Sequence, residues 1–313
     1  MQQNWVKKGL IYNVTGNFEW NKTHAQVPIV DVLNNERLRI YYATRDVNGK
    51  SHTSFVETSL EKPNEILYEH PNPILDLGPL GAFDDSGIMP TSILSIDDTT
   101  KFLYYIGWTT RGTVPYSNAI GLAISKDQGK SFQKYSEGPI IGVGPTEPFF
   151  TGTCYVLKLA SEYIAYYLSC TGWIKVAGKL EPIYDLKIAT SRDAVYWKQS
   201  GAVAIPLEQG EGGIASASVV TLGSKFHMWF SVRGESDFRE NKENSYRIGY
   251  AESDDGYHWK RVSNSILSPS KSDWDSTMLA YPNVVLSDQK LWLFYNGNGF
   301  GKSGFGYAEL NIQ

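Results

Sequence analysis

The sequence predicts an all-β protein, a single five-bladed β-propeller domain spanning residues 1–313. Three observations predict this fold. A two-strand segment recurs five times at an even period, most copies are followed by a second hairpin, and the N-terminal segment resembles the strand that the last copy lacks. No segment shows sustained helical periodicity. The composition agrees, because 13% aromatic residues and 29 glycines favour strands joined by tight turns.

The recurring segment is an apolar strand followed by a strand rich in aromatic residues. Its five copies cover residues 27–33 with 38–45, 89–94 with 102–108, 152–157 with 163–168, 215–220 with 226–231, and 281–286 with 291–295. Aligned at the start of the first strand, the copies lie 62, 63, 63 and 66 residues apart, at Pro28, Pro90, Thr153, Ser216 and Pro282. A fixed period of this kind predicts a repeat architecture, so each copy is expected to be one blade.

A second hairpin follows the recurring segment, at residues 120–132, 186–197 and 248–259. Aspartate and glycine between alternating apolar runs mark a hairpin turn. Each blade is therefore expected to have four antiparallel strands, here termed inner, second, third and outer from the axis outward. The turns between the third and outer strands are interpreted as structural, because aspartate and glycine suit tight turns without a further role.

The two ends of the chain predict how the ring closes. The fifth repeat ends after its third strand, residues 303–309, and residues 4–12 resemble residues 258–267 from the fourth repeat. The N-terminal strand is therefore expected to complete the last blade. Closing the ring removes free sheet edges, which would otherwise invite association with other chains.

Composition and motifs restrict the partners and the location. A net charge of −4 with mixed signs gives no reason to expect nucleic acid or an anionic membrane as a partner. No apolar run approaches a membrane span and the N-terminus does not resemble a signal peptide, so a cytoplasmic location is predicted. Cys154 and Cys170 are interpreted as buried free thiols. Phosphate-binding, dinucleotide and zinc motifs are missing, so neither a cofactor nor a metal is expected.

The ligand site is expected on the face where the inner strands begin and the second strands end. Its candidates before the inner strands are His24, Gln26, Asp84, Asp85, Glu147, Glu211, Asp273 and Asp275. Its candidates after the second strands are Arg45, Asp46, Trp108, Arg111, Trp173, Arg233 and Asn296. Acids, arginines and tryptophans at one rim suit a sugar, because aromatic rings stack on pyranose C–H surfaces while charged and amide groups bind vicinal hydroxyls.

The acidic candidates differ in their local context. Glu147 lies between two prolines in a stiff loop, which favours a functional role, while Glu211 lies among glycines that would allow a ligand to approach the backbone. Asp84 and Asp275 each follow an aromatic residue, which favours a shared role in bracing the loop. Asp85 departs from that pattern, so both a structural and a functional role stay open. The arginines are equally compatible with pairing to these acids.

With five blades, a rim of Trp, Asp and Glu, and proline at three inner-strand starts, the chain resembles the five-bladed propeller glycosidase superfamily. This superfamily contains arabinanases and xylosidases, invertases and levansucrases, and mannoside phosphorylases. The resemblance implies carboxylates that flank a glycosidic bond. It assigns Glu211 to the general acid of the fourth blade, and Glu147 or Asp85 to the carboxylate that modulates the site.

The first inner strand departs from the superfamily pattern. Residues 23–28 carry His24 and Gln26 but no carboxylate where the superfamily has its catalytic aspartate. This departure argues against ordinary hydrolysis and leaves phosphorolysis open, in which phosphate itself attacks the sugar. Arg45, Arg111 and Arg233 would suit a phosphate, because guanidinium forks match its oxygens.

The resulting hypothesis is a carbohydrate-active enzyme that acts on a glycosidic bond in an axial pocket. Glu211 or Glu147 would be the general acid and Asp85 the second carboxylate, with the remaining rim residues binding a small saccharide or sugar phosphate. The alternatives are a phosphorylase, an enzyme acting on a phosphorylated or nucleotide sugar, and a sugar-binding propeller without catalysis. Two of the three carboxylates roughly 5 to 10 Å apart across the pocket would favour the glycosidase. Rim carboxylates that are all salt-bridged to an arginine, with no open pair left, would favour binding alone.

Overall fold

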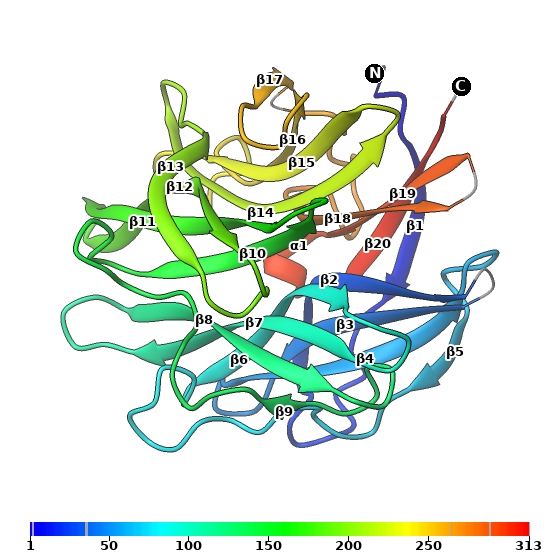
Figure 1. The fold of residues 1–313 in the computed structure, drawn as a ribbon, viewed down its shortest axis with the longest axis horizontal. Helices are drawn as coiled ribbons and strands as arrows, with labels where there is room; N and C mark the ends of the chain where they lie inside the picture. The colour runs from blue at the N-terminus through cyan, green and yellow to red at the C-terminus, as the bar shows by residue number, and fades with distance from the viewer. Residues whose placement is uncertain (2, 35–36, 264, 288, 313) are drawn as a thin grey trace.

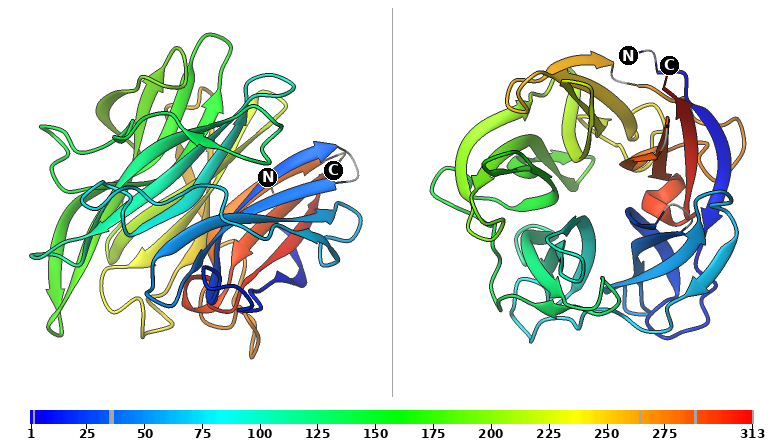
Figure 2. Two further views of the ribbon diagram at one scale, coloured as in Figure 1. Left: turned by 90° about the horizontal axis from the view of Figure 1, so that it is seen from below. Right: turned by 45° about the vertical axis from the view of Figure 1, so that its right-hand side comes forward.

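The strands of the protein follow one another round a ring, as Figure 1 and the right-hand view of Figure 2 show. The structure is a computed structural model that describes residues 1, 3–34, 37–263, 265–287 and 289–312. Over these residues, twenty strands form five four-stranded antiparallel units. Single parallel pairings, Ser51 with Gly87 and Tyr184 with Gly213, join the first unit to the second and the third to the fourth.

The five blades run in chain order from the inner to the outer strand. Blade 1 is β2 (Thr23–Asn34), β3 (Arg37–Arg45), β4 (Ser51–Ser59) and β5 (Ile66–Glu69). Blade 2 is β6 (Gly87–Ser95), β7 (Lys101–Thr110), β8 (Tyr116–Ser125) and β9 (Gln133–Lys134). Blade 3 is β10 (Thr151–Lys158), β11 (Tyr163–Val176), β12 (Lys179–Ser191) and β13 (Lys198–Ile205). Blade 4 is β14 (Glu211–Leu222), β15 (Lys225–Gly234), β16 (Arg247–Ser253) and β17 (Lys260–Ser263).

Blade 5 contains both ends of the chain. Its strands are β18 (Ala280–Ser287), β19 (Lys290–Asn296), β20 (Phe305–Asn311) and β1 (Val6–Tyr12), with the short helix α1 (Asn298–Gly301) between β19 and β20. The outer strand β1 pairs antiparallel with β20, from Val6 opposite Glu309 to Tyr12 opposite Phe305. The two termini consequently lie side by side (Figures 1 and 2). The N-terminal strand thus closes the last blade, which confirms the prediction from the sequence.

The hydrophobic core lies between neighbouring blades rather than on the axis. Five clusters of buried apolar side chains each join two adjacent blades, and the cluster between blades 5 and 1 contains Tyr12, Leu38 and Phe294. A single four-stranded sheet has no partner for its two apolar faces, so each blade buries them against the next one. Cys154 and Cys170 are buried free thiols within this packing, as predicted. None of the described helices is long and apolar enough to cross a membrane.

In blades 1, 2 and 3, a buried tyrosine of the second strand links the blade to a turn of the next one. The three tyrosines donate the hydroxyl to a backbone carbonyl at 2.7 Å: Tyr41 to Gly129, Tyr104 to Ala194 and Tyr166 to Gly256. Each accepting turn is held by an aspartate that accepts backbone N–H groups, namely Asp127, Asp193 and Asp255. The third-to-outer turns therefore have the structural role expected for them.

Near the axis, polar contacts tie neighbouring inner strands together at equivalent positions. Side-chain oxygens of Ser92, Ser218 and Asn283 accept the backbone N–H of Val156, Val284 and Val30 respectively, at 2.8 to 3.2 Å. Each bond runs from one blade to the next. The backbone of the inner strands near the axis is thereby fixed by contacts across the blade boundaries.

A register break recurs in every inner strand just before these contacts. The breaks fall between Gln26 and Ile29, Pro90 and Ser92, Thr151 and Cys154, Ala215 and Ser218, and Ala280 and Asn283. Within three of them Val27, Ser216 and Tyr281 adopt positive φ values of 53°, 52° and 54°, which are uncommon for residues other than glycine. Register breaks of this kind occur at β-bulges, which redirect side chains and often lie next to functional sites. Here they lie where the inner strands line the axis.

Replacing Tyr104 by phenylalanine tests the contact between second strand and turn. The change leaves the carbonyl of Ala194 buried without its donor, so the free energy of unfolding is expected to fall by about 1–3 kcal/mol. Urea unfolding followed by tryptophan fluorescence measures the change. Tyr196→Phe is the matched control, because the Tyr196 side chain is 73% exposed and should be neutral. Equal losses in both variants would contradict the assigned role.

Candidate functional site

The propeller has a pocket on its axis with a volume of about 330 Å³, to which all five blades contribute. We term it the axial pocket. Its lining residues are Gln26, Val27, Arg45, Ser51, Met89, Ile106, Trp108, Tyr116, Asn118, Phe150, Gly152, Thr153, Leu168, Tyr184, Ala215, Phe238, Arg239, Tyr246, Tyr281 and Phe300. Most of them lie where inner strands begin, second strands end or third strands begin, which is the face expected to carry the site.

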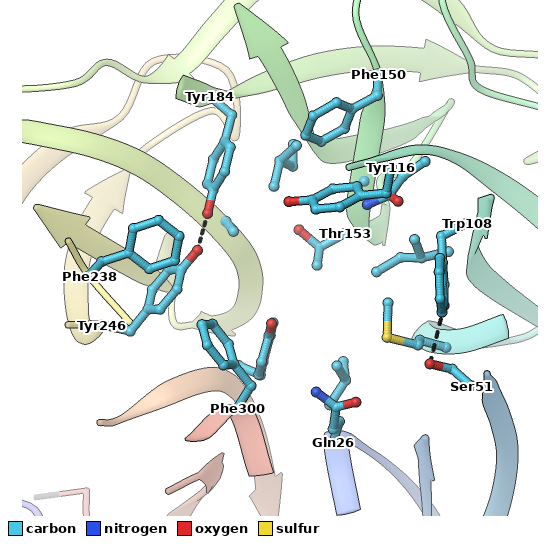
Figure 3. Close-up of a pocket in the computed structure, with 18 of the residues that line it drawn as sticks. Gln26, Ser51, Trp108, Tyr116, Phe150, Thr153, Tyr184, Phe238, Tyr246 and Phe300 are labelled. Carbon is cyan, nitrogen blue, oxygen red and sulfur yellow. Dashed lines mark hydrogen bonds between the residues drawn. The ribbon is translucent and has the colours of Figure 1, made fainter. Parts of the chain in front are cut away.

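Aromatic rings form most of the wall of the axial pocket. Figure 3 shows Tyr184, Tyr246 and Phe300 on one side and Trp108 on the other. The indole Nε1 of Trp108 donates to the hydroxyl of Ser51 at 3.2 Å, which fixes the plane of the ring. Rings held in this way offer flat apolar surfaces on which the C–H face of a sugar can stack.

Trp173, the other predicted stacking residue, lies one layer behind this wall. Its ring packs against Tyr116 and Phe150, with centroid distances of 5.6 and 5.7 Å. Both of these rings line the axial pocket, whereas Trp173 does not. Trp173 therefore supports the wall from behind.

The charged groups in the lining of the axial pocket are both arginines. Arg45, at the end of β3, donates from Nε to the side-chain oxygen of Gln26 at 3.2 Å. Within the described residues its guanidinium has no carboxylate at ion-pair distance, in contrast to Arg39, Arg239 and Arg261. Burial lowers the pKa of Arg45, yet an arginine stays protonated near neutral pH. The pocket thus contains a positive charge that the described chain does not neutralise.

Arg239 is the second arginine of the axial pocket and comes from the loop between β15 and β16. Its guanidinium lies over the ring of Phe238, 4.2 Å from the centroid, and 3.8 Å from a carboxylate oxygen of Glu181. The Arg239 side chain is 40% exposed, so this ion pair is screened by solvent. Arg239 thus presents a partly exposed guanidinium to the pocket, while its partner Glu181 is buried.

The predicted general acid Glu147 is buried outside the lining of the axial pocket. Its carboxylate accepts hydrogen bonds from Tyr167 at 2.8 Å and Ser169 at 2.6 Å, and Lys187 lies 3.8 Å away. Only 3% of Glu147 is exposed. The carboxylate is occupied by groups of its own blade, so the geometry gives no support to a catalytic role for Glu147.

The other two predicted catalytic carboxylates also lie outside the lining. Glu211 forms a two-pronged ion pair with Arg261 of the outer strand, with 2.9 Å between Nη1 and Oε2. Asp85 accepts from the backbone N–H of Gly81 at 2.9 Å and from the Ser86 hydroxyl at 2.8 Å. In the described part of the chain, no aspartate or glutamate lines the axial pocket. The expected pair of carboxylates facing each other across the pocket is therefore missing from it.

The acids that precede the inner strands are held by a contact that several blades share, which we term the brace. Asp84 accepts from Tyr105 at 3.2 Å and pairs with Lys134 of the outer strand at 2.7 Å. Asp275, predicted to bind substrate, accepts from Tyr295 at 2.9 Å and pairs with Lys7 of the outer strand. In each case the acid before the inner strand is held by a tyrosine of the second strand. This is the bracing expected for Asp84 and Asp275, and Glu147 has the same kind of tyrosine partner.

Three more predicted binding residues lie outside the lining of the axial pocket. His24 has a positive φ of 68°, and burial together with the nearby cations Arg45 and Lys302 lowers its pKa to about 4, so its imidazole is neutral at pH 7. Asp46 accepts the N–H groups of its own hairpin turn. Asn296 ties blade 5 to blade 1, because its Oδ1 accepts the N–H of Val27 and its Nδ2 donates to Ala25, both at 2.6 Å. None of the three lines the axial pocket.

Arg233 is fully buried behind the wall of the axial pocket. Its Nε donates to the hydroxyl of Tyr184 at 3.0 Å, and its guanidinium lies over the ring of Phe238, 3.8 Å from the centroid. The hydroxyl of Tyr184 is hydrogen-bonded in turn to that of Tyr246 (Figure 3). Arg233 therefore positions a tyrosine pair that lines the pocket, rather than contacting a ligand there itself.

One of the two hydroxyl hydrogens of Tyr184 and Tyr246 is not used in the hydrogen bonds described above. Tyr184 accepts from Arg233, and one of the two tyrosines donates to the other. Each hydroxyl carries a single hydrogen, so the accepting tyrosine keeps its own hydrogen for a third partner. Both residues line the axial pocket. The pair thus offers one O–H donor to a bound molecule.

Several lining residues were not among the sequence candidates. Tyr184 and Tyr246 each lie two residues before the equivalent residues Leu186 and Ile248 of the third strands, and this recurrence was available in the sequence. Tyr116 is the first residue of β8 and has no counterpart at that position. Arg239 and Phe300 lie in loops without a counterpart in the other repeats, so no repeated pattern indicated them. Among the described residues no group of three or more His, Cys, Asp or Glu side chains is placed to hold a metal ion.

Solved structures with the same fold include several that are described as glycosidases or glycoside hydrolases. A glycosyl hydrolase from Bacteroides ovatus matches with a TM-score of 0.72 and 14% identity, over 98% of this chain and 94% of that one. A structure from the GH130 family of mannoside phosphorylases, described as containing glycoside hydrolases that target β-1,2 mannosidic linkages in Candida mannan, matches equally well over 98% and 95%. The β-fructofuranosidase BmSUC1 of Bombyx mori matches with a TM-score of 0.60. The chain has the fold of the propeller glycosidase superfamily, as the resemblance implied.

Sequence comparison places the chain in a narrower group. It is 33% identical over 308 residues to two proteins of Mycobacterium tuberculosis, MT1551 of strain CDC 1551 / Oshkosh and Rv1502 of strain H37Rv, both described as uncharacterized. The alignments cover 98% of this chain and 99% of each relative. The chain therefore belongs to the family of these two mycobacterial proteins. No protein-family model matches it.

Changing Glu147 to glutamine tests whether this carboxylate is a brace. The amide cannot accept all the hydrogen bonds that the carboxylate accepts from Tyr167 and Ser169, so the free energy of unfolding should fall by about 1–3 kcal/mol. Chemical denaturation measures this loss. Glu137→Gln, at an exposed position, is the matched control and should leave stability unchanged. Unchanged stability of the Glu147 variant would contradict the brace and restore Glu147 as a functional candidate.

Proposed function

We propose that the protein is a carbohydrate-active protein whose axial pocket binds a saccharide carrying an anionic group, a phosphate or a carboxylate. The observation that carries this proposal is Arg45, a largely buried guanidinium without a carboxylate partner among the described residues, in a pocket lined by no acid. A buried charge is costly unless it is paired, so an anionic ligand group would complete the site. The planar guanidinium fork matches the oxygens of a phosphate or carboxylate.

The rest of the axial pocket suits the sugar. Its aromatic rings offer stacking surfaces, while the amides of Gln26 and Asn118 and the hydroxyl of Thr153 offer polar contacts for sugar hydroxyls. A volume of about 330 Å³ lies at the small end of ligand pockets, which favours a ligand of one or two sugar units within it. Sugar phosphates are compounds of the cell interior, so a cytoplasmic location forms part of this proposal.

Transfer of a glycosyl group to phosphate is the reaction that this pocket suits best. Hydrolysis by the usual mechanism requires two carboxylates beside the glycosidic bond, and the lining contains none. In phosphorolysis a phosphate oxygen bonds to the anomeric carbon, the glycosidic C–O bond breaks, and the leaving oxygen takes up a proton. Arg45 and Arg239 would hold the phosphate, and the tyrosine pair of Tyr184 and Tyr246 would donate to the leaving oxygen.

Binding without catalysis is the second candidate function. It is favoured by the engagement of Glu147 and Glu211 in buried contacts of their own blades. A propeller that has lost its acid and base would keep the aromatic and cationic wall and still recognise an anionic saccharide. The two functions share the ligand class and differ only in turnover.

Replacing Arg45 by glutamine tests the ligand class. Calorimetric titration with hexose 1-phosphates, hexuronic acids and the neutral parent hexoses compares charged with uncharged ligands. A hydrogen bond to a charged group is worth about 1.5–3 kcal/mol, so the variant should bind the charged ligands about 10- to 100-fold more weakly and the neutral ones unchanged. Arg192→Gln, at an exposed turn of the opposite face, is the control. Equal affinity for charged and neutral ligands in the wild-type protein would refute the proposal.

A screen of aryl glycosides with and without inorganic phosphate tests the reaction. Release of the aryl group only in the presence of phosphate is expected for glycosyl transfer to phosphate. Release without phosphate would overturn the phosphorolytic assignment in favour of hydrolysis. Measurable binding of sugar phosphates with no release under either condition would assign the second candidate function instead.

A further inference from the structure

Two loops without a counterpart in the other repeats meet at one wall of the axial pocket. The loop of residues 235–246 brings Phe238 and Arg239 from blade 4, and the turn of α1 brings Phe300 from blade 5. The ring of Phe300 packs edge-on against those of Phe238 and Tyr246, with centroid distances of 6.3 and 6.0 Å. Figure 3 shows the three rings on the same side of the pocket. The turn of blade 5 thus packs directly on the loop of blade 4.

Arg239 lies against rings from both loops. Its guanidinium carbon is 4.2 Å from the ring centroid of Phe238 and 5.9 Å from that of Phe300. A guanidinium is attracted to aromatic faces at such distances. The ion pair of Arg239 with Glu181 is long, at 3.8 Å, and solvent screens it because the arginine side chain is 40% exposed. The two rings, more than the ion pair, therefore restrict where this guanidinium points.

Phe300 adopts a backbone conformation that is unfavourable for its residue type. Its φ is +59°, and Gly299 and Gly301 on either side of it also have positive φ values. Glycine enters this left-handed region without strain, whereas a phenylalanine there is uncommon. Residues strained in this way persist where the surrounding structure fixes them, and they are concentrated at functional sites. A glycine at this position would avoid the strain, so the aromatic ring is what the strained conformation retains.

The backbone on both sides of Phe300 is packed closely against neighbouring segments. A Cβ atom at Gly297 would lie 2.2 Å from the carbonyl oxygen of Trp274. A Cβ atom at Gly301 would lie 2.5 Å from the carbonyl oxygen of Ala25, in blade 1. Only glycine allows the chain to approach so closely. The turn is therefore held at both ends, and Phe300 cannot leave its strained conformation without moving these contacts.

We infer that Phe300 is a positioning residue whose ring holds the guanidinium of Arg239 at the wall of the axial pocket. The inference rests on the proposed function, in which Arg239 contacts the anionic group of a saccharide. A guanidinium that is oriented beforehand loses less freedom when an anion binds, so the affinity for charged ligands rises without a new contact. In this role Phe300 acts through Arg239 rather than by stacking on the sugar.

NMR relaxation of the arginine Nε–H groups tests the positioning in the full chain without a ligand. The signal of Arg239 is assigned by its absence from Arg239→Gln. Phe300→Gly removes the ring and should lower the order parameter of the Arg239 Nε–H by about 0.2 or more. Phe300→Leu, which keeps an apolar side chain in the cluster but has no aromatic face, should lower it too and serves if Phe300→Gly does not fold.

The control for this experiment is Gln128→Gly. Gln128 also has a positive φ, of 61°, but it is exposed in a third-to-outer turn on the opposite face. This variant should leave the order parameter of Arg239 unchanged. An Arg239 that stays as ordered in the Phe300 variants as in the wild-type protein overturns the inference.

A double-mutant cycle tests the consequence for binding. Calorimetry with glucose 1-phosphate and mannose 1-phosphate compares the wild-type protein, Phe300→Gly, Arg239→Gln and the double variant. Phe300→Gly should weaken binding about 3- to 10-fold when Arg239 is present. It should weaken binding less than about twofold in the Arg239→Gln background, because the group through which it acts is gone. Arg111→Gln, at an exposed position outside the lining of the axial pocket, is the control for the arginine change.

The outcomes separate the positioning role from the function on which it rests. An equal loss of affinity in both backgrounds means that the Phe300 ring contacts the sugar itself, which overturns the positioning role and leaves the proposed function standing. Failure of both sugar phosphates and of hexuronic acids to bind the wild-type protein removes the proposed function, and the inference with it. The relaxation measurement still shows in that case whether Phe300 orders Arg239.

Discussion

A buried polar group precedes the inner strand in four of the five blades, and the pocket depends on its contacts. In blades 2, 3 and 5 it is a carboxylate, at Asp84, Glu147 and Asp275, and a tyrosine of the second strand donates to it. In blade 1 the amide of Asn21 has the equivalent partner in Tyr42. The brace fixes where the inner strand begins. Because the axial pocket is lined largely from these strand starts, its shape depends on these four local contacts inside the blades.

The braces also determine the charge of the pocket. Asp84, Glu147, Glu211 and Asp275 are each engaged by a tyrosine, a lysine or an arginine of their own blade, so their negative charges are paired within the fold. What remains at the axis is aromatic surface, a few amides and hydroxyls, and the guanidinium groups of Arg45 and Arg239. The axial pocket of this propeller thus has an electrostatic character opposite to that of a site built around two carboxylates.

The blade pattern was predictable from the sequence, whereas the direction of the rim side chains was not. An even period and a missing strand are properties of the chain itself, and they predicted both the ring and its closure by β1. Whether Glu211 faces the axis depends on Arg261, fifty residues further along the chain, and no local pattern contains that pairing. Arg45, Gln26 and Trp108 were predicted and do line the pocket, because they end or begin strands next to the axis. Arg239 and Phe300 come from loops that occur once, so no repeat indicated them.

The closure by β1 has a consequence for how the protein comes apart. In an open solenoid the terminal repeats have one free face and can detach first. Here the outer strand of blade 5 is the first strand of the chain, and apolar clusters join every neighbouring pair of blades, including blade 5 to blade 1. No blade is terminal, so removing any one of them exposes two apolar interfaces at once. The ring should therefore lose its structure as a cooperative whole, and the ligand site, which needs all five blades, disappears in the same step.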